Sequence, residues 1–319
     1  MSNSFDLADL PGMGDKLPKG KHLFPMQGDE PFMPERIIAD FRFQKAPTKL
    51  LLYALNQGRA SALVGPTGAG KTSHAIQLFE RLNKPYVVVS CHSDFEASDL
   101  FGYERVRANP DGRAETVYID GPVIRAMREG IAVILEERDS LPPTVNLALN
   151  NVLDGLGYEI PETGEHVSPA KGFVMIATAN TAGAGDEAGR YVTSHIASAS
   201  SNNRWLVALV DYMAEEDEIE VLVGKASKNA FREGLEGLVK FANATRAAAA
   251  SGEMEAPATT RELIQTVELS SFFLHLDEAA EMAYFNKLSS VDRVSAQKQW
   301  SLLFSTGDES DADTPDGDS

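Results

Sequence analysis

The fold of this chain is decided by the stretch Gly65-Pro66-Thr67-Gly68-Ala69-Gly70-Lys71-Thr72. It matches the G-x-x-x-x-G-K-[ST] pattern of a phosphate-binding loop. Residues 61–64 before it are a short apolar run that predicts a buried strand, and residues 73–82 after it have the apolar spacing of a helix. The motif therefore stands between a strand and a helix, which is the context that a phosphate-binding loop requires.

The residue types in this motif suit a nucleoside triphosphate. Glycine allows backbone N–H groups to wrap around a β-phosphate, and the N-terminus of the following helix attracts negative charge. The ammonium group of Lys71 can reach the β and γ oxygens, and the hydroxyl of Thr72 is a candidate ligand for Mg²⁺. We therefore expect ATP and Mg²⁺ to bind here, with contacts from Gly65, Pro66, Thr67, Gly68, Ala69, Gly70, Lys71, Thr72 and Ser73.

Further apolar runs predict the rest of a parallel sheet. They are separated by stretches with helical spacing and cover residues 86–89, 131–135, 173–178 and 204–209. Strands that are apolar on both faces are typical of parallel sheets covered by helices. We expect an α/β core with a parallel five-stranded sheet over residues 48–212, after an N-terminal arm at residues 1–47.

Two segments interrupt the core pattern, and other patterns follow it. Residues 104–119 and 157–169 each place turn residues inside a strand-like stretch, so each predicts a hairpin insertion. Residues 213–305 are rich in Glu, Ala and Leu at helical spacing and predict a small all-α lid domain. Residues 306–319 are rich in Asp, Gly, Ser and Pro, and we expect this acidic tail to be disordered.

Composition and charge bound the function classes. The 47 acidic residues outnumber the 29 basic residues and give a net charge of −18. Such a field repels nucleic acid backbones, so we expect no nucleic acid partner. The single cysteine, Cys91, argues against structural disulfides, and no apolar run approaches the roughly 18 residues of a membrane span. Residues 1–21 lack an apolar leader, and we therefore expect a cytoplasmic protein without membrane contact.

Polar residues follow two of the predicted strands. Glu136 and Glu137 come directly after the run 131–135, and Asn180 comes just after the run 173–178. Ligands of open α/β sheets lie at the carboxyl ends of the strands, so these side chains are expected beside the phosphate loop. We assign Glu136 to the metal, Glu137 to orienting the attacking water, and Asn180 to a hydrogen bond with the γ-phosphate or that water.

The order of these motifs resembles that of an AAA+ ATPase. An arginine, Arg204, is the first residue of the last predicted strand, and Arg261 follows two threonines in the helical region. Within that superfamily the sequence most resembles the MoxR-type branch. Within that branch it most resembles the small ATPase subunit of aerobic cobaltochelatase, and this resemblance covers about residues 45–300. Glu136 and Asn203 stand where the family pattern has Asp. The similar segments are residues 120–130, 160–164, 177–186 and 189–191.

This resemblance implies a P-loop AAA+ core and a homo-oligomeric ring, commonly a hexamer, with ATP at the subunit interfaces. By position, Asn180 resembles sensor 1, Arg204 resembles the arginine finger that reaches a neighbour's γ-phosphate, and Arg261 resembles the sensor 2 arginine of the lid. A guanidinium supplied in trans stabilises charge on the transferring phosphoryl group. The resemblance also implies a von Willebrand A-like partner protein with its client complex, and hairpin insertions that contact the partner.

We therefore predict an ATPase that acts as a motor and remodels or activates a partner complex, with a cobaltochelatase-like subunit that supports metal insertion as the leading candidate. Two alternatives stay open. The chain could be a nucleotide-gated scaffold or chaperone with little turnover, for another client such as rubisco or a reductase, or a phage-encoded relative. It could also be a DNA-directed AAA+ motor, although its acidic charge argues against that function.

Overall fold

Two compact units, Met1–Asp211 and Tyr212–Ser319, make up the chain. The computed structural model describes residues 4–13, 23–25, 37–180, 199–226, 232–273 and 275–304. Residues 1–3, 14–22 and 26–36 of the predicted arm, the family-like residues 181–186 and 189–191, and the acidic tail at 306–319 lie outside the described residues. Each unit has its own hydrophobic core and is treated separately below.

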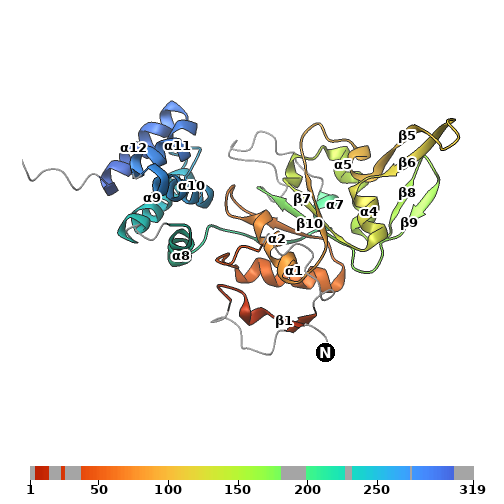
Figure 1. The fold of residues 1–319 in the computed structure, drawn as a ribbon, viewed down its shortest axis with the longest axis horizontal. Helices are drawn as coiled ribbons and strands as arrows, with labels where there is room; N and C mark the ends of the chain where they lie inside the picture. The colour runs from red at the N-terminus through yellow and green to blue at the C-terminus, as the bar shows by residue number, and fades with distance from the viewer. Residues whose placement is uncertain are drawn as a thin grey trace, which may run out of the picture. The chain divides into compact units, whose positions relative to one another are not determined.

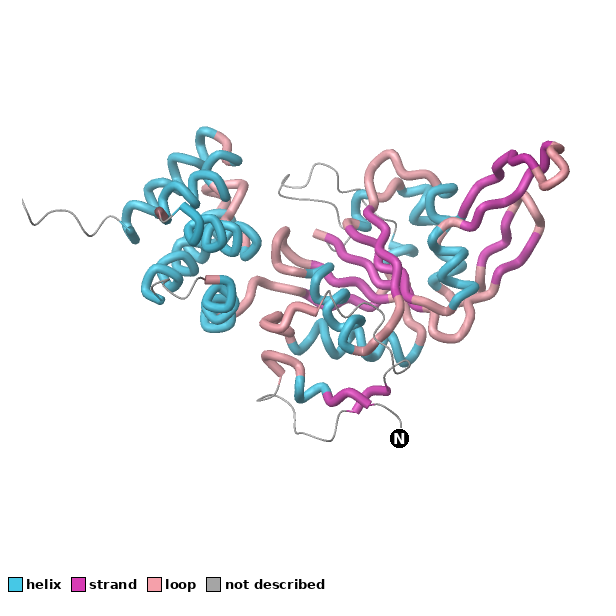
Figure 2. Tube along the Cα trace, viewed as in Figure 1, coloured by secondary structure: helices cyan, strands magenta, loops and turns pink. Residues whose placement is uncertain are grey.

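A five-stranded parallel sheet forms the centre of the first unit, as Figure 2 shows in magenta. All of its neighbouring strands run parallel, so their carboxyl ends meet at one edge. This sheet confirms the predicted fold class. Its strands lie in the order β11 (Leu206–Leu209), β3 (Ser61–Val64), β10 (Val174–Ala179), β7 (Ala132–Glu136) and β4 (Tyr86–Ser90).

The last strand is shorter than its apolar run predicts. The run begins at Arg204, but the N–H groups of Arg204 and Trp205 bond back to the carbonyl oxygens of Ser201 and Asn202 at 3.4 and 3.1 Å. Those bonds form a turn after the short helix α7 (Ala199–Asn202), so the strand begins at Leu206. A turn at this point sets the position of the arginine predicted to act in trans.

Helices cover both faces of the sheet (Figure 1). Alternate side chains of one strand point to opposite faces. Ile134 therefore packs in one core cluster with the first two helices, and Val133 packs in the other with the short helix α3 (Ala97–Phe101) and the three helices after it. The two helical layers are α1 (Lys45–Gln57) with α2 (Lys71–Arg81), and α4 (Pro122–Glu129) with α5 (Pro143–Ala148) and α6 (Asn150–Leu153).

Part of the predicted arm packs onto the first helical layer. Strand β1 (Ser4–Asp6) pairs antiparallel with β2 (Leu23–Pro25), and a 3₁₀ helix follows β1 at Leu7–Asp9. The apolar side chains of Leu10 and Met13 are buried in the same cluster as α1 and α2. Helix α1 begins at Lys45, so its first turn lies within the segment predicted as arm.

Two antiparallel hairpins occupy the segments predicted as insertions. In Figure 1 the β5–β6 hairpin extends away from the sheet beyond α4. Arg128 of α4 donates to Asp120 at 2.8 Å and to both carboxylate oxygens of Glu165 at 2.6 and 2.8 Å, and thereby joins the base of the first hairpin to the turn end of the second. The hairpins are β5 (Gly102–Ala108) with β6 (Ala114–Asp120), and β8 (Tyr158–Ile160) with β9 (Glu165–Val167).

The second unit is helical in the residues that the structure describes. Its core is built around the ring contacts of Phe241 with Trp300 and Phe285. The helix that begins at Leu276 ends at Ala283 and is followed by a 3₁₀ helix at Phe285–Lys287. No described helix of either unit is long and apolar enough to cross a membrane. The helices are α8 (Glu215–Lys225), α9 (Arg232–Ala250), α10 (Thr260–Phe273), α11 (Leu276–Ala283) and α12 (Ser290–Phe304).

Candidate functional site

At two positions of the loop between β3 and α2, the backbone has a conformation that only glycine adopts without strain. Gly68 and Gly70 have φ angles of 77° and 81°, in the left-handed region. Gly70 is the N-cap of α2, and Lys71 is the first residue of that helix. Successive backbone N–H groups in such a loop, together with a helix N-terminus, form a site for a phosphate group.

Gly65 is required because another strand passes close to it. A Cβ atom at this position would lie 1.8 Å from the carbonyl oxygen of Val210. The N–H of Gly65 donates to Ala179 at 3.2 Å, and the N–H of Val210 donates to Val64 at 2.8 Å. The loop is therefore held between the carboxyl ends of β10 and β11.

We expect Gly65→Ala to destabilise the first unit and to remove nucleotide binding. The added methyl group would collide with backbone, and overpacking of this kind costs about 1–3 kcal/mol. Thermal melts and a titration with fluorescent mant-ATP measure both effects. Gly234→Ala is the matched control, because a Cβ there meets open space within helix α9. A Gly65→Ala protein with the melting temperature and affinity of the parent would contradict this packing argument.

The ammonium group of Lys71 lies at the carboxyl edge of the sheet. Its Nζ donates to the carbonyl oxygens of Gly65 and Pro66, each at 2.8 Å, and to Oδ1 of Asn180 at 2.9 Å. Burial lowers the pKa of Lys71 to about 8, although the carboxylates of Asp139 and Glu137 act in the opposite direction. All three hydrogen-bond acceptors are neutral, so a bound triphosphate would supply the negative charge that this buried cation lacks.

Thr72 and Glu136 form the candidate metal site. The Oγ1 of Thr72 donates to Oε1 of Glu136 at 2.9 Å, and the hydroxyl of Ser90 donates to Oε2 of Glu136 at 3.2 Å. Hydroxyl and carboxylate oxygens are the ligands that Mg²⁺ prefers, and Mg²⁺ is commonly held by one or two protein groups together with substrate phosphates. The residues present therefore fit Mg²⁺, and the longer Glu136 reaches the threonine in place of the family's Asp.

Glu137 differs from Glu136 in backbone and in exposure. Its φ and ψ angles are 55° and 45°, a left-handed conformation that is strained for a residue other than glycine. Its N–H donates to Oγ1 of Thr178 at 3.3 Å. The side chain is exposed, and its carboxylate has no hydrogen bond or ion pair with any residue in the described ranges. It is therefore available to a water molecule.

Asn180 joins the phosphate loop to an acid that we did not predict. Its Oδ1 accepts from Lys71 at 2.9 Å and from the hydroxyl of Thr67 at 3.3 Å, while its N–H donates to Asp139 at 2.9 Å. Asp139 is buried in the 3₁₀ helix Arg138–Ser140. The signal that could have revealed Asp139 is its place in the sequence: it is a third acid within four residues of the end of the predicted strand 131–135.

Further functional candidates are polar residues at the ends of neighbouring strands. Thr178 in β10 lies close to Thr72, with 3.4 Å between the hydroxyl oxygens, and Ser90 ends β4. Arg138, which follows Glu137, is buried as well. The sequence offered only a weak signal for Thr178, which is a polar residue inside the apolar run 173–178.

Of the two predicted arginines, Arg204 makes its described contacts elsewhere in the first unit, and Arg261 belongs to the second unit. Arg204 donates through Nε to both oxygens of Asp154 at 3.0 and 2.9 Å and through Nη1 to Ser200. Within the described ranges it makes no contact with the residues around Lys71. Arg261 is exposed in the first turn of α10, in the second unit. Ser73 is exposed in the first turn of α2.

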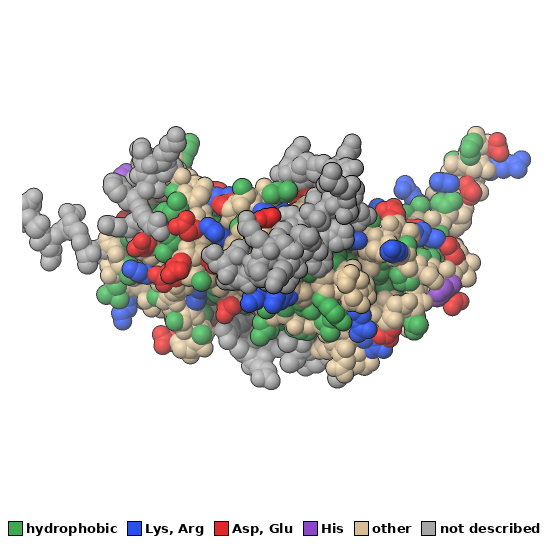
Figure 3. All heavy atoms as spheres, turned by 90° about the horizontal axis from the view of Figure 1, so that it is seen from below, with side chains coloured by type: hydrophobic (Ala, Val, Ile, Leu, Met, Phe, Trp, Pro, Cys, Tyr) green, Lys and Arg blue, Asp and Glu red, His purple; other side chains and the backbone are tan. Residues whose placement is uncertain are grey.

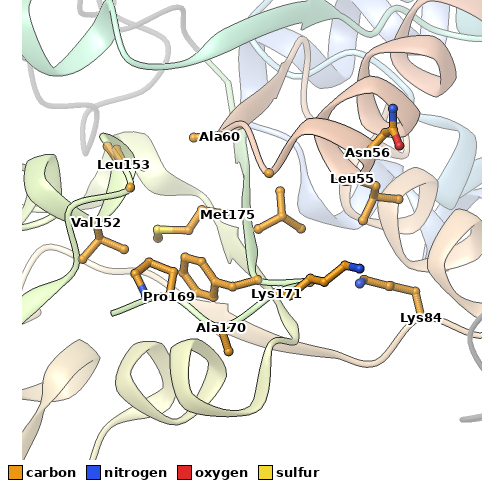
Figure 4. Close-up of a pocket in the computed structure, with 15 residues that line it drawn as sticks. Leu55, Asn56, Ala60, Lys84, Val152, Leu153, Pro169, Ala170, Lys171 and Met175 are labelled. Carbon is orange, nitrogen blue, oxygen red and sulfur yellow. The ribbon is translucent and has the colours of Figure 1, made fainter. Parts of the chain in front are cut away.

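A cavity of about 480 Å³ opens at the opposite edge of the sheet, where the strands begin (Figure 4). Its lining combines apolar side chains such as Phe173 and Met175 with Lys84 and Lys171. Ala60 precedes β3 and Lys84 precedes β4, so this cavity is separated from the phosphate loop by the length of the strands. It is no part of the candidate nucleotide site.

Comparisons with known proteins agree with this geometry. Residues 61–198 match the AAA domain of the dynein-related subfamily, and residues 218–299 match the CbbQ/NirQ/NorQ C-terminal domain. An uncharacterized protein of Staphylococcus saprophyticus is 32% identical over 228 residues, which are 71% of this chain and 83% of that protein. One of Staphylococcus epidermidis is 31% identical over 239 residues, which cover 74% and 86%.

The aerobic cobaltochelatase subunit CobS of a Sinorhizobium species is a more distant relative. It is 26% identical over 270 residues, which are 83% of this chain and 81% of that subunit. These matches confirm the resemblance to MoxR-type AAA+ proteins that the motifs predicted. The chain therefore belongs to the AAA family: it is an AAA+ ATPase of the CbbQ/NirQ type, with a dynein-related AAA domain followed by a CbbQ/NirQ/NorQ C-terminal domain.

Proposed function

We propose that this protein hydrolyses ATP as a ring-shaped motor and uses the energy to remodel or activate a partner complex. The observation that carries the proposal is the set of contacts at the carboxyl edge of the sheet. There hydrogen bonds of 2.9 Å join Lys71 to Asn180 and Thr72 to Glu136, beside the carboxylate of Glu137, which has no hydrogen-bond or ion-pair partner among the described residues.

In this proposal each side chain has one role. The loop N–H groups and Lys71 bind the phosphates, and Asn180 holds the γ-phosphate or the attacking water. Glu137 orients and polarises that water. Thr72 and Glu136 would hold Mg²⁺, which when bound offsets the charge on the phosphate oxygens. Asp139 keeps Asn180 in place through its backbone N–H.

The arginine needed to stabilise the transferring phosphoryl group would come from a neighbouring protomer. Arg204 is held by Asp154 and Ser200 in its own chain, and no described contact brings it to its own phosphate loop. Its second amino group, Nη2, has no partner among the described residues. A guanidinium held at two points with one free end suits a donor to an adjoining subunit. Arg261 would contribute from the lid as a sensor.

The hairpins are the parts that we assign to partner contact. The β5–β6 strands are exposed along most of their length, and Figure 3 shows acidic and basic side chains mixed on the projecting tip. Its basic residues Arg105, Arg107 and Arg113 alternate with Glu104, Asp111 and Glu115. We propose a protein partner, namely the von Willebrand A-like protein that the family resemblance implies. We propose a metal-inserting chelatase as the client complex, because one relative is an aerobic cobaltochelatase subunit.

We expect Lys71→Ala to abolish nucleotide binding. The variant loses the only ammonium group that the site places against the phosphates, and the Kd for mant-ATP should rise by at least about 100-fold. Lys84→Ala is the matched control, because Lys84 is another half-buried lysine whose pKa burial lowers, but it lines the cavity at the far edge of the sheet. Equal affinity of the Lys71→Ala and Lys84→Ala proteins would remove the basis for the site.

The two other functions predict different measurements. A nucleotide-gated scaffold would bind ATP and assemble but release little phosphate, so steady-state phosphate release distinguishes it from a motor. A DNA-directed motor would bind labelled duplex tightly at low salt. The mixed charges of the projecting hairpin give no basic patch on that element, so we expect weak DNA binding.

A further inference from the structure

The segment from Glu136 to Asp139 is the point where several elements of the first unit meet. Glu136 contacts Thr72 at the start of α2, and Asp139 contacts the end of β10. Arg138 points elsewhere: its Nη2 donates to Oδ1 of Asn202 at 2.8 Å. One short segment therefore touches the phosphate loop, the sensor strand and the turn before β11.

Arg138 is buried against the segment that carries Arg204. Its guanidinium carbon lies 4.8 Å from the ring centre of Trp205, and both side chains are only 6% exposed. Asn202 and Trp205 flank Arg204, which points outward to Asp154. Arg138 thus contacts the residues two positions before and one position after the arginine that we assign to the neighbouring site.

The cost of burying this guanidinium suggests a specific role. Its Nε has no hydrogen-bond partner in the described part of the chain, and no described carboxylate forms an ion pair with it. Apolar residues of similar volume commonly replace buried charges without loss of stability. The hydrogen bond to Asn202, the ring contact with Trp205 and the nearby charge of Asp139, which are the interactions found among the described residues, do not by themselves require an arginine for stability.

The backbone next to Arg138 is strained. Glu137 holds its left-handed conformation between two anchored neighbours, Glu136 on one side and Arg138 on the other. Strain of this kind persists only where surrounding contacts fix it. The side chain of Arg138 supplies one such contact, because it ties the residue after Glu137 to Asn202 and Trp205.

We propose that Arg138 is a positioning residue that couples the carboxylate of Glu137 in one nucleotide site to Arg204, which serves the next site. The inference rests on the proposed ATP hydrolysis. A change at Glu137 when ATP binds or is cleaved would move Arg138 against Trp205 and so reorient the turn that presents Arg204. The relay has two discrete contacts, the Asn202 hydrogen bond and the Trp205 ring.

Tryptophan fluorescence gives a direct test. Trp205 and Trp300 are the two tryptophans of the chain, so Trp300→Phe leaves Trp205 as the single reporter. In this background we expect unlabelled MgATP to change the Trp205 emission. Adding Arg138→Met should abolish that change and lower kcat by at least about 10-fold, while the Kd for mant-ATP stays within about twofold. Arg138→Lys keeps the charge but not the planar fork, and should recover part of both signals.

Arg81→Met is the matched control. Arg81 also lies over an aromatic ring, at 5.1 Å from the centre of Phe43, and also donates to a neighbouring segment, at 2.6 Å to the carbonyl of Ile38. It sits at the far end of α2, so Arg81→Met should keep the parent kcat and the Trp205 response. Thermal melts of the Arg138 and Arg81 variants should be similar.

Three results would overturn the coupling. The first is an ATP-bound parent whose Trp205 emission does not change. The second is an Arg138→Met protein with the parent's kcat and emission response. The third is an Arg138→Met protein in which the mant-ATP affinity and the melting temperature fall together with kcat. Failure of the proposed function looks different, because the Trp300→Phe protein with Arg138 intact would then bind no mant-ATP, or bind it and release little phosphate, and the coupling falls with it.

Discussion

Replacing Arg204 by alanine should lower ATP turnover by about 1,000-fold while leaving ATP binding intact, because arginines of this kind are worth about 10³–10⁵ in kcat. The effect falls on the transition state, where charge develops on the transferring phosphoryl group. Stability should change little: the Asp154 pair is partly exposed, with the side chains 26% and 38% accessible, and such pairs contribute about 0–1 kcal/mol. Steady-state phosphate release and mant-ATP titration separate the two effects.

Mixed assemblies decide whether Arg204 acts in trans. Arg204→Ala protomers keep the phosphate loop, and Lys71→Ala protomers keep the arginine. In an equal mixture of two inactive variants, about a quarter of the interfaces combine an intact loop with an intact neighbouring arginine, so activity should return to about a quarter of the parent's. Arg293→Ala is the control, since Arg293 pairs with Glu281 on the second unit with similar exposure. Absence of recovery on mixing would place the arginine in its own site or outside catalysis.

Glu137→Gln should bind ATP with the parent's affinity and fail to cleave it. The amide keeps the size of the side chain but cannot accept a proton from water, and general-base groups contribute about 10²–10⁴ in rate. We therefore expect a fall in kcat of at least about 100-fold. ATP should remain uncleaved on the protein, which rapid filtration followed by chromatography of the nucleotide would detect.

Two comparisons make this assignment specific. Glu129→Gln changes an exposed glutamate at the end of α4 and should leave turnover unchanged. Glu136→Gln weakens the oxygen set around Thr72 and should raise the Mg²⁺ concentration needed for half-maximal turnover, an effect that Glu137→Gln should lack. If Glu137→Gln turned over ATP as fast as the Glu129→Gln control, the role of water orientation would belong to another residue.

Much of the candidate site could be read from local sequence because parallel strands end at a common edge. The motif at residues 65–72, the acids after the run 131–135 and the asparagine after the run 173–178 each sit at the end of an apolar run. Hydrogen bonds of 2.9 Å then join Lys71 to Asn180 and Thr72 to Glu136, across 109 and 64 residues of sequence. The strand-end rule was sufficient to bring these residues together.

Other parts depended on contacts that no local pattern reveals. Arg204 appeared to belong to a strand, but backbone bonds to Ser201 and Asn202 made it part of a turn. No local pattern predicts that Arg138 is buried; it is buried because it packs on the ring of Trp205 and donates to Asn202. Side-chain burial is decided by which segments meet, and these segments are 64 residues apart in the case of Arg138 and Asn202.

The sequence by itself determined the five-stranded α/β core, the phosphate loop and the acids and amide at the strand ends, because apolar periodicity and glycine requirements act over a few neighbouring residues. Only the tertiary structure decided why Gly65 admits no side chain, which acid holds Asn180, and where Arg138 and Arg204 point. Those outcomes follow from close packing between segments far apart in the chain, where a single methyl group or hydrogen bond selects one arrangement.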